Sequence, residues 1–317
     1  MVAVVLLVLG AGLLTAGAEG FAENVTGASR RLGVSVLALG VLLAGAEPEE
    51  AVTAMLASGQ GHPALAAGDA VGANQVILTL TLGLAAVLTR LPVGRAALQY
   101  AVAATVVGAV SWLFLLNGVL GRLEGLVLVL LYAAGVVWVW RREKAPPLIG
   151  ELAELEAVQG GSQGDGDGRS TGRALLVLLL GVLGMGAGGA LAVRGAEDLV
   201  DVLDLGESVV GLTVLALATS AEMVALIWSA RRRGLSELVV AGTVGAVAYN
   251  STVTLGLAAL VSPLGLGRHN VILSVAAFTA VLPLVLLASR RSGVLPRAVG
   301  VVLVAAYVVA VGFLLAG

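Results

Sequence analysis

The sequence predicts an all-α membrane protein with about ten transmembrane helices in two inverted five-helix repeats. Three observations predict this fold class: the composition, the recurrence of long apolar spans and an internal repeat. The chain has 317 residues, of which 59% are hydrophobic and 12% are charged, whereas soluble domains are about 25% charged. Apolar runs of about 20 residues, the length that crosses a bilayer as a helix, recur along almost the whole chain.

Composition also argues against several classes of function. The net charge of -2 gives no indication of a nucleic-acid partner. The absence of cysteine excludes disulfides and thiol chemistry. The chain has only two histidines, His62 and His269, which argues against a zinc cluster.

Each predicted span follows one apolar run. The ten spans lie at roughly 1–18, 34–59, 64–89, 96–118, 123–140, 174–193, 207–230, 236–262, 270–289 and 297–316. The first could instead be a cleaved signal peptide, because three small residues follow its apolar run at 16–18. No lysine or arginine precedes that run, however, and the Gly-Ala-Glu sequence at 17–19 recurs at 195–197. We therefore expect the first span to belong to the repeat.

The basic residues predict the orientation, since Lys and Arg near helix ends are retained on the cytoplasmic side. Of the 18 basic residues, only Arg122, Arg194 and Arg268 lie in loops that follow even-numbered spans. All the others follow odd-numbered spans. We therefore expect both termini to lie outside, or in the periplasm of a bacterium with two membranes.

An internal repeat gives the strongest prediction of the architecture. Residues Leu32 to Glu49 align without a gap against Leu205 to Glu222, at an offset of 173. The same offset carries 71–73 onto 244–246 and much of 79–86 onto 252–259. Each half then has an odd number of spans, so the second half enters the membrane inverted, as in many secondary transporters. The predicted domains are a first five-helix repeat at 1–141, a cytoplasmic linker at 142–173 and a second, inverted repeat at 174–317.

The predicted linker carries an acidic stretch at 151–156 and a glycine-rich segment at 160–168. The Asp-Gly alternation at 165–168 is similar to part of a calcium-binding loop, but the full spacing with a terminal glutamate is absent. A solvated, flexible tether is therefore the stronger interpretation.

Carboxylates inside the apolar spans are the candidate functional groups. Glu47, Glu49, Glu50 and Glu222 lie inside spans two and seven, and Asp69 lies near the start of span three. A carboxylate at the centre of a membrane helix costs about 2.5 kcal/mol or more, so it persists mainly where it faces a polar pathway. The alternative is a position near an interface, which is more plausible for Asp69 and Glu47. Glu49 and Glu222 occupy equivalent positions in the two repeats and are the leading candidates.

The surroundings of these carboxylates suit cation binding. Pro48 interrupts the helix and frees a carbonyl oxygen from its helical bond. Carbonyl and carboxylate oxygens are hard ligands for calcium or sodium, and a carboxylate in low dielectric also binds protons. Thr219, Ser220 and Asn250 offer neutral oxygens in the second half. The same site could therefore bind a cation or protons, which is the competition that an antiporter needs.

These residues resemble the calcium/cation antiporter superfamily, which includes sodium/calcium and proton/calcium exchangers. Gly211-Leu212-Thr213-Val214, followed by 218–222, resembles the segment that ends in the glutamate motif of the family. Gly68-Asp69-Ala70-Val71-Gly72 resembles the glycine-rich start of its third helix, with Asp69 where asparagine is common. The resemblance covers 32–86 and 205–259. It implies ten helices in two inverted halves and a cation site at the midplane.

The chain departs from the family pattern in two ways. Glu49 and Glu222 follow the motif at the four-residue spacing of proton/calcium exchangers, although Glu50 fits the longer spacing of sodium/calcium exchangers in the first half. The chain also lacks polar residues at three positions where the family often has them, Ala73, Ile77 and Ala246. Fewer side-chain oxygens imply fewer ion sites or a different ion.

The leading hypothesis is a secondary active antiporter that exchanges Ca²⁺ for H⁺ or Na⁺. Glu49 and Glu222 would be the metal ligands, and Glu47, Glu50, Asp69, Thr219, Ser220 and Asn250 would complete the ion site. The resemblance implies alternating access, in which spans one and six slide over spans two, three, seven and eight on small residues. We expect no cofactor besides the transported cation, no partner besides inorganic cations and the lipid bilayer, and a place in a prokaryotic plasma membrane.

Two alternatives to this hypothesis stay open. The missing polar residues would also fit a transport-inactive scaffold or sensor, or an antiporter for a different cation. A membrane-embedded enzyme lacks support, because the sequence offers neither a nucleophile with its base nor a phosphate-binding glycine loop. The sequence gives no indication of an oligomeric state.

Overall fold

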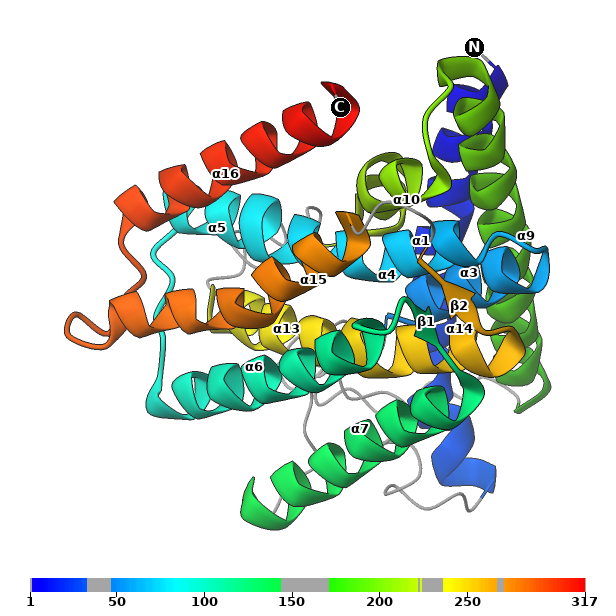
Figure 1. Cartoon of the computed structure of the whole chain (residues 1–317). Coiled ribbons are helices and arrows are strands. Elements are labelled where there is room, and N and C mark those ends of the chain that lie inside the picture. Colours follow the sequence, from blue (N-terminus) through cyan, green and yellow to red (C-terminus); the bar gives the residue numbers. More distant parts are fainter. Residues whose placement is uncertain are drawn as a thin grey trace.

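The computed structural model of the chain describes residues 2–32, 47–143, 171–221, 223, 236–266 and 271–316. The predicted features that lie wholly or partly outside the described residues are the first part of span two, most of the linker, and the last part of span seven together with Glu222. Within the described ranges the chain is a helical bundle with two short strands (Figure 1). The all-α class is confirmed.

The first half begins with a helix of 31 residues and ends with one of 22 residues. Its elements are α1 (Val2–Leu32), α3 (Pro48–Gly59), α4 (Pro63–Gln75), the π-helical η1 (Val76–Thr81), α5 (Leu82–Leu88), α6 (Arg95–Leu115), β1 (Val119–Leu120) and α7 (Arg122–Glu143).

The second half follows the same order of spans. Its elements are α9 (Thr171–Leu203), α10 (Glu207–Val210), the π-helical η2 (Gly211–Leu215), α11 (Ala216–Thr219), α13 (Ser236–Tyr249), the π-helical η3 (Asn250–Thr254), α14 (Leu255–Val261), β2 (Leu264–Gly265), α15 (Val271–Val281), the 3₁₀-helical η4 (Leu282–Ser289) and α16 (Arg297–Ala316). Among the described residues, seven helices are long and apolar enough to cross a membrane. Two shorter apolar helices, Val2–Gly17 and Glu207–Thr219, belong to predicted spans one and seven.

Some helices are longer than the apolar runs from which they were predicted. We expected span one to end at 18 and span six to cover 174–193, whereas α1 runs to Leu32 and α9 covers Thr171–Leu203. The extra turns of α9 carry charged residues at their outer end. Hydropathy therefore marked the apolar part of each helix, because nothing in a charged turn prevents helix formation.

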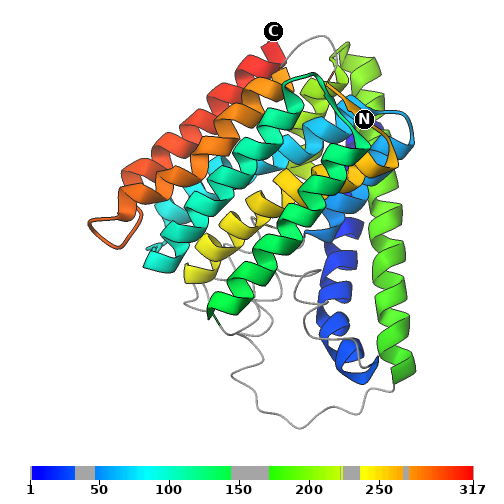
Figure 2. The same cartoon turned by 60° about the horizontal axis from the view of Figure 1, so that its bottom comes forward.

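Backbone pairing between loops follows the inverted repeat. On the face that carries the start of α1 and the end of α16, which we call the terminal face, β1 pairs antiparallel with β2 (Figure 2). On the opposite face, Pro92 forms an antiparallel bridge with Val294. The first pairing joins the loop after span four to the loop after span eight, and the second joins the loops after spans three and nine. Exchanging the halves converts one pairing into the other, as an inverted repeat requires.

Two left-handed glycines occupy equivalent places in these pairings. Gly118 has φ 84° and accepts a hydrogen bond from the backbone N–H of Leu266 at 3.0 Å. Gly293 has φ 69° and accepts one from the backbone N–H of Val93 at 2.8 Å. Only glycine adopts this conformation without strain. Val93 and Leu266 are separated by the 173-residue offset of the sequence repeat.

Glycine pairs bring the outer helix of each half onto the central helix of the other half. A Cβ on Gly125 of α7 would lie 2.7 Å from the carbonyl oxygen of Gly256 in α14. A Cβ on Gly300 of α16 would lie 2.7 Å from the carbonyl oxygen of Gly83 in α5. Gly83 and Gly256 are again repeat equivalents. The two halves are therefore interlocked by close backbone contacts that only small residues allow.

The helices α1 and α9 form an antiparallel pair that packs against the rest of the bundle. Small residues recur every seven positions at their contact, where Ala3 meets Gly195, Gly10 meets Gly188 and Gly17 meets Gly181. A Cβ on Gly10 or Gly17 would lie 2.8 Å from a backbone carbonyl oxygen of α9. This pair corresponds to spans one and six, which we expected to slide over the other spans on small residues.

Each π-helical segment contains a threonine that donates to the carbonyl four residues earlier. Thr213 in η2 donates to Val209 at 2.6 Å, and Thr252 in η3 donates to Ala248 at 2.5 Å. Thr79 in η1, the repeat equivalent of Thr252, donates to the carbonyl of Gln75 at the end of α4. A hydroxyl in this position supplies a donor to a carbonyl where the regular helical ladder is interrupted. Such π-helical turns are frequent at functional sites.

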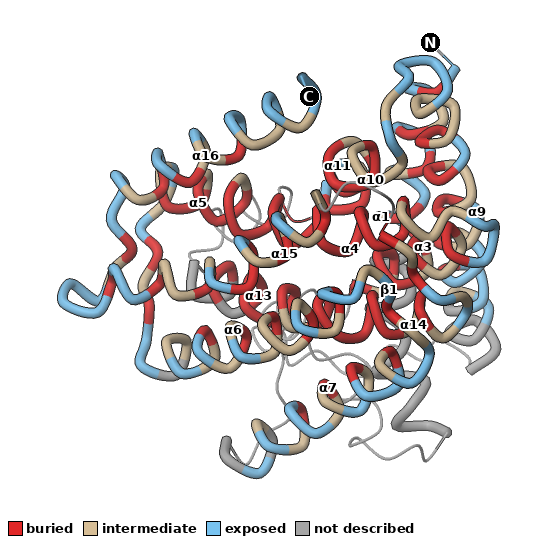
Figure 3. The backbone as a smooth tube through the Cα atoms, in the orientation of Figure 1, coloured by how far each residue is buried: buried red, intermediate tan, exposed pale blue. Residues whose placement is uncertain are grey.

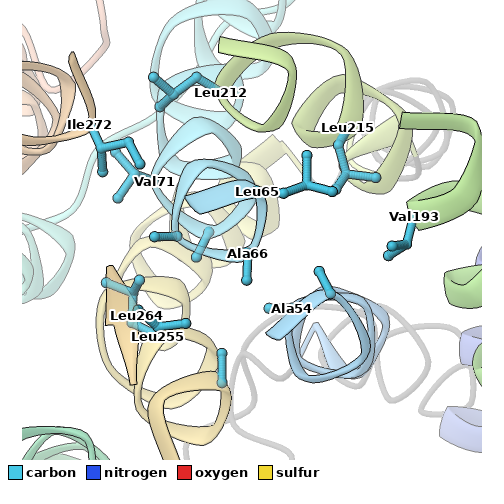
Figure 4. Packing of buried hydrophobic residues seen from close by; sticks show 14 of the residues in the cluster. Ala54, Leu65, Ala66, Val71, Val193, Leu212, Leu215, Leu255, Leu264 and Ile272 are labelled. Atoms are coloured by element: carbon cyan, nitrogen blue, oxygen red, sulfur yellow. The ribbon is translucent and has the colours of Figure 1, made fainter. Parts of the chain in front are cut away.

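The buried core lies between the central helices. Figure 3 shows α4 and α14 buried along much of their length, whereas the outer sides of α7 and α16 are exposed. Those exposed sides are apolar, with Phe313 81% and Leu130 58% exposed, as expected of lipid-facing surfaces. Figure 4 shows how side chains of α3, α4, η2, α9, α14 and α15 meet in one cluster. The central helices thus form a rigid frame for the polar groups between them.

Candidate cation site

The acidic segment of span two lies at the start of a helix inside the bundle. Helix α3 begins at Pro48, with Glu47 as its N-cap residue and Glu49 and Glu50 in its first turn. Proline is favoured at this position, because its missing N–H would have no helical partner. The three glutamates are 5%, 1% and 0% exposed. Negative charge near a helix N-terminus is favourable, so the start of α3 stabilises the carboxylates of its first turn.

Three carboxylates of the first half each meet a neutral side chain of the second half. Asn250 donates from Nδ2 to Oε2 of Glu47 at 2.8 Å. Ser220 donates from Oγ to Oε1 of Glu50 at 2.9 Å. The hydroxyl Oγ1 of Thr219 lies 3.2 Å from Oδ1 of Asp69. All six side chains are buried, so these contacts form a polar layer between the two repeats.

Two of these carboxylates keep an oxygen without a hydrogen-bond partner. Oε2 of Glu50 and Oδ2 of Asp69 are buried, and no described residue donates to either. Neither carboxylate forms a salt bridge, since the ion pairs between described residues both involve His62. The hydroxyl of Thr53, one turn after Glu50 on α3, also has no partner in the described part of the chain. A buried acceptor of this kind is costly unless a proton or a cation reaches it.

The predicted site residues are largely brought together. Glu47, Glu50 and Asp69 meet Asn250, Ser220 and Thr219 across the repeat boundary, as given above. Glu49 is buried on the same turn of α3, and its proposed partner Glu222 lies outside the described residues. Within the described ranges no three acidic or histidine side chains converge closely enough to hold one metal ion. Among the described residues, the site is thus a layer of carboxylates with neutral oxygens.

Sequence reasoning gave less weight to polar groups next to this layer. Asn74 donates to the hydroxyl of Ser251 at 2.9 Å, and both side chains are buried between α4 and η3. Tyr132 of α7 and Tyr249 of α13 form an edge-to-face pair with ring centroids 5.5 Å apart, and they pack against Ala51, the residue after Glu50. A tyrosine inside an apolar span was the available signal, because its hydroxyl needs a polar neighbour.

Comparison with known proteins places the chain in a family. The family model described as sodium/calcium exchanger protein matches residues 2–141 and 173–316. The inner membrane protein YrbG of Escherichia coli is 27% identical over 98% of this chain and 95% of its own length. An uncharacterized membrane protein of Methanocaldococcus jannaschii is 25% identical over 77% of this chain and 75% of its own length.

A solved structure has the same fold. The sodium-calcium exchanger NCX_Mj, soaked with 10 mM Na⁺ and no Ca²⁺, superposes with a TM-score of 0.61 and 23% identity. The match covers 98% of each chain. The predicted fold of inverted repeats and the predicted resemblance are thereby confirmed. The chain belongs to the sodium/calcium exchanger family, and it is a membrane protein of the cation antiporter class rather than an enzyme.

Proposed function

We propose that the chain exchanges Ca²⁺ for H⁺ or Na⁺ through the polar layer between its two repeats. The first repeat supplies the carboxylates of Glu47, Glu49, Glu50 and Asp69. The second repeat supplies the oxygens of Thr219, Ser220 and Asn250, together with the carboxylate of Glu222. The proposal includes the predicted boundaries of the repeats and a prokaryotic plasma membrane, with both termini outside and the linker in the cytoplasm.

The observation that carries this proposal is a pair of buried carboxylate oxygens to which no described residue donates, Oε2 of Glu50 and Oδ2 of Asp69. Calcium takes six to eight oxygen ligands, many of them carboxylates, carbonyls and amides. The layer offers these ligand types, and no lysine or arginine in the described part of the chain is paired to Glu50 or Asp69. A divalent cation, a sodium ion or a proton would each satisfy the same oxygens. Mutually exclusive binding of different cations at one site supports coupled exchange.

The neutral partners have a role in that exchange. Ser220 and Asn250 hold Glu50 and Glu47 across the repeat boundary at 2.9 Å and 2.8 Å. Both partners also carry an oxygen that can turn to a cation, since a hydroxyl and an amide are both donor and acceptor. The bonds therefore position the carboxylates when no cation is bound and leave ligands available when one is. A charge buried without a cation or proton is expensive, which favours exchange over a one-way leak.

Proteoliposomes loaded with a proton- or sodium-sensitive dye test the proposal. A calcium gradient is expected to drive counter-ion flux in the parent protein, and Glu50→Gln and Glu222→Gln are each expected to lower that flux at least about tenfold, the effect of losing roughly 1.4 kcal/mol of cation binding. Glu124→Gln is the matched control. Its carboxylate accepts from the backbone N–H of Gly121 at 2.7 Å on the terminal face, and Glu124 takes no part in the three hydrogen bonds described for the layer.

The outcomes separate the alternatives. Flux that survives both substitutions at the layer would refute the proposed site. Flux that responds to another cation but not to calcium would replace the proposed substrate and keep the site. A parent protein that binds no cation in calorimetry and supports no flux would instead be a scaffold or sensor.

A further inference from the structure

A histidine on the terminal face joins three elements of the bundle. His62 is the N-cap residue of α4, and its side chain is about one-third exposed. Its Nε2 lies 3.0 Å from Oε1 of Glu197 on α9, and its Nδ1 lies 2.9 Å from Oε1 of Glu207, the first residue of α10. The backbone of His62 is fixed by bonds to Ala57 and Ala66. One side chain thus holds spans six and seven against the start of span three.

The chemistry of this contact depends on protonation. An imidazolium has two N–H donors, whereas a neutral imidazole has one donor and one acceptor. Both ring nitrogens of His62 face a carboxylate oxygen. A neutral His62 would therefore direct a lone pair at one of the two carboxylates, and that contact would become repulsive. Both contacts are favourable together only when the ring is charged, and imidazole changes charge in the range of about pH 5 to 8.

Elsewhere on the terminal face Arg122 donates to the backbone carbonyl of Val261 at 3.2 Å. Four other charged groups lie on the chain segment that carries Glu197 and Glu207. They are Arg194, Asp198 and Asp201 on α9 and Asp204 in the turn before α10. None of them forms an ion pair with His62 among the described residues. On α3 and α4 the acidic residues are those of the buried layer, and Arg268 and His269 before α15 lie outside the described ranges. The two contacts of His62 are therefore set by Glu197 and Glu207.

The contact between His62 and Glu197 lies where α9 meets the rest of the bundle. Helix α9 packs along α1 through backbone-close glycine contacts, while the remaining spans interlock with one another. Helix α9 contacts α3 at Gly189, where a Cβ would lie 3.0 Å from the side chain of Leu56 on α3. At the terminal face, Glu197 of α9 is tied to the bundle by His62. Loss of that contact would remove one of the interactions that hold this end of α9, where Val193 and Ala196 also pack in the buried core cluster.

We propose that Glu197, His62 and Glu207 form a proton-controlled latch that fastens the α1–α9 pair to the bundle on the terminal face. Protonation of His62 closes the latch by giving each carboxylate a donor. Deprotonation opens one of its two contacts. The latch rests on the proposed function only for its effect on transport, because the contact itself is independent of the cation layer.

Distance measurements test the latch without measuring transport. The chain has no cysteine, so spin labels can be placed on Leu123→Cys of α7 and Val202→Cys of α9, which are 80% and 75% exposed on the terminal face. Double electron–electron resonance in liposomes is run at about pH 5 and about pH 8, the ends of the imidazole range. We expect a narrow distribution at the lower pH and a broader one, shifted to other distances, at the higher pH.

Substitutions identify the group responsible. His62→Gln is expected to give the broad distribution at both pH values, and His62→Lys, which keeps a positive charge, the narrow one at both. Glu207→Gln removes one arm and is expected to reduce the pH response. Asp198→Asn, one residue from Glu197 and without a contact to His62, is the matched control and is expected to respond as the parent does. A parent distribution that does not change with pH, or a His62→Gln protein that still responds, would overturn the latch even if cation exchange is demonstrated.

Discussion

Replacing Asp69 by asparagine tests whether the buried layer is built for cations. The substitution keeps Oδ1, which lies 3.2 Å from the hydroxyl of Thr219, and replaces only Oδ2, which has no donor among the described residues. It therefore removes one negative charge from a fully buried site at nearly constant shape. A charged side chain at the centre of a membrane helix costs about 2.5–3.5 kcal/mol on insertion scales. In a chelator without added cation, Asp69→Asn is expected to raise the free energy of unfolding, with that figure as the upper limit.

The opposite effect is expected when calcium is present. A ligand that binds only the folded protein stabilises it by about 2.7 kcal/mol at a concentration one hundred times its Kd. Because Asp69→Asn removes a ligand charge, the stabilisation by calcium should fall while the cation-free stability rises. Unfolding by sodium dodecyl sulfate in bicelles, with and without calcium, measures both quantities. Asp198→Asn on α9 is the control, because a substitution at a partly exposed surface position changes stability by about 0.5 kcal/mol or less. If Asp69→Asn lowered the cation-free stability and left the calcium effect unchanged, the carboxylate would be structural.

Two further substitutions probe the packing between the halves and the polar layer. Gly125→Ala places a methyl group 2.7 Å from the carbonyl oxygen of Gly256 and is expected to lower the free energy of unfolding by about 1–3 kcal/mol through overpacking. Gly135→Ala is the control on the same helix, because nothing lies within 4 Å of its Cβ, and it should be neutral or stabilising. Equal melting temperatures of the two variants would contradict the close packing of the halves. Asn250→Leu removes the donor to Glu47, and leaving a buried acceptor without its donor costs about 1–3 kcal/mol. Calorimetry is expected to show a cation affinity weakened about tenfold or more. An unchanged affinity would remove Asn250 from the site.

The fold was predictable because its signals are long and repeated. Apolar runs of membrane length mark the spans, and one offset of 173 carries residues such as Gly83 and Val93 onto Gly256 and Leu266, which the structure places in equivalent contacts. The π-helical turns were not predicted, since their only trace is a threonine such as Thr213 inside an apolar run. Many threonines donate to a carbonyl in the preceding turn of a regular helix, so that trace is not specific.

The sequence also did not predict which glutamate of the acidic segment faces which neighbour. Consecutive residues on a helix point about 100° apart, so the start of α3 at Pro48 decides which glutamate faces which neighbour. The structure turns Glu50 to Ser220, and the N-cap residue Glu47 to Asn250. The repeat alignment favoured Glu49 because it matches Glu222 in sequence. An alignment records equivalent positions, whereas hydrogen bonds across an interface join residues that need not be equivalent. Glu47 and Ser220 illustrate this, because they are repeat equivalents but bond to Asn250 and to Glu50.

The same packing that defines the site also limits which parts of the molecule can move. Each outer helix is joined to the central helix of the opposite half by a pair of glycines, α7 to α14 at Gly125 and Gly256, and α16 to α5 at Gly300 and Gly83. Motion of one half against the other would break both contacts together with the paired loops on the two faces. The α1–α9 pair has no such exchange of helices, and its own contact is a row of small residues. Alternating access at the layer is therefore expected to come from this pair, and His62 lies where a single proton could hold it in place.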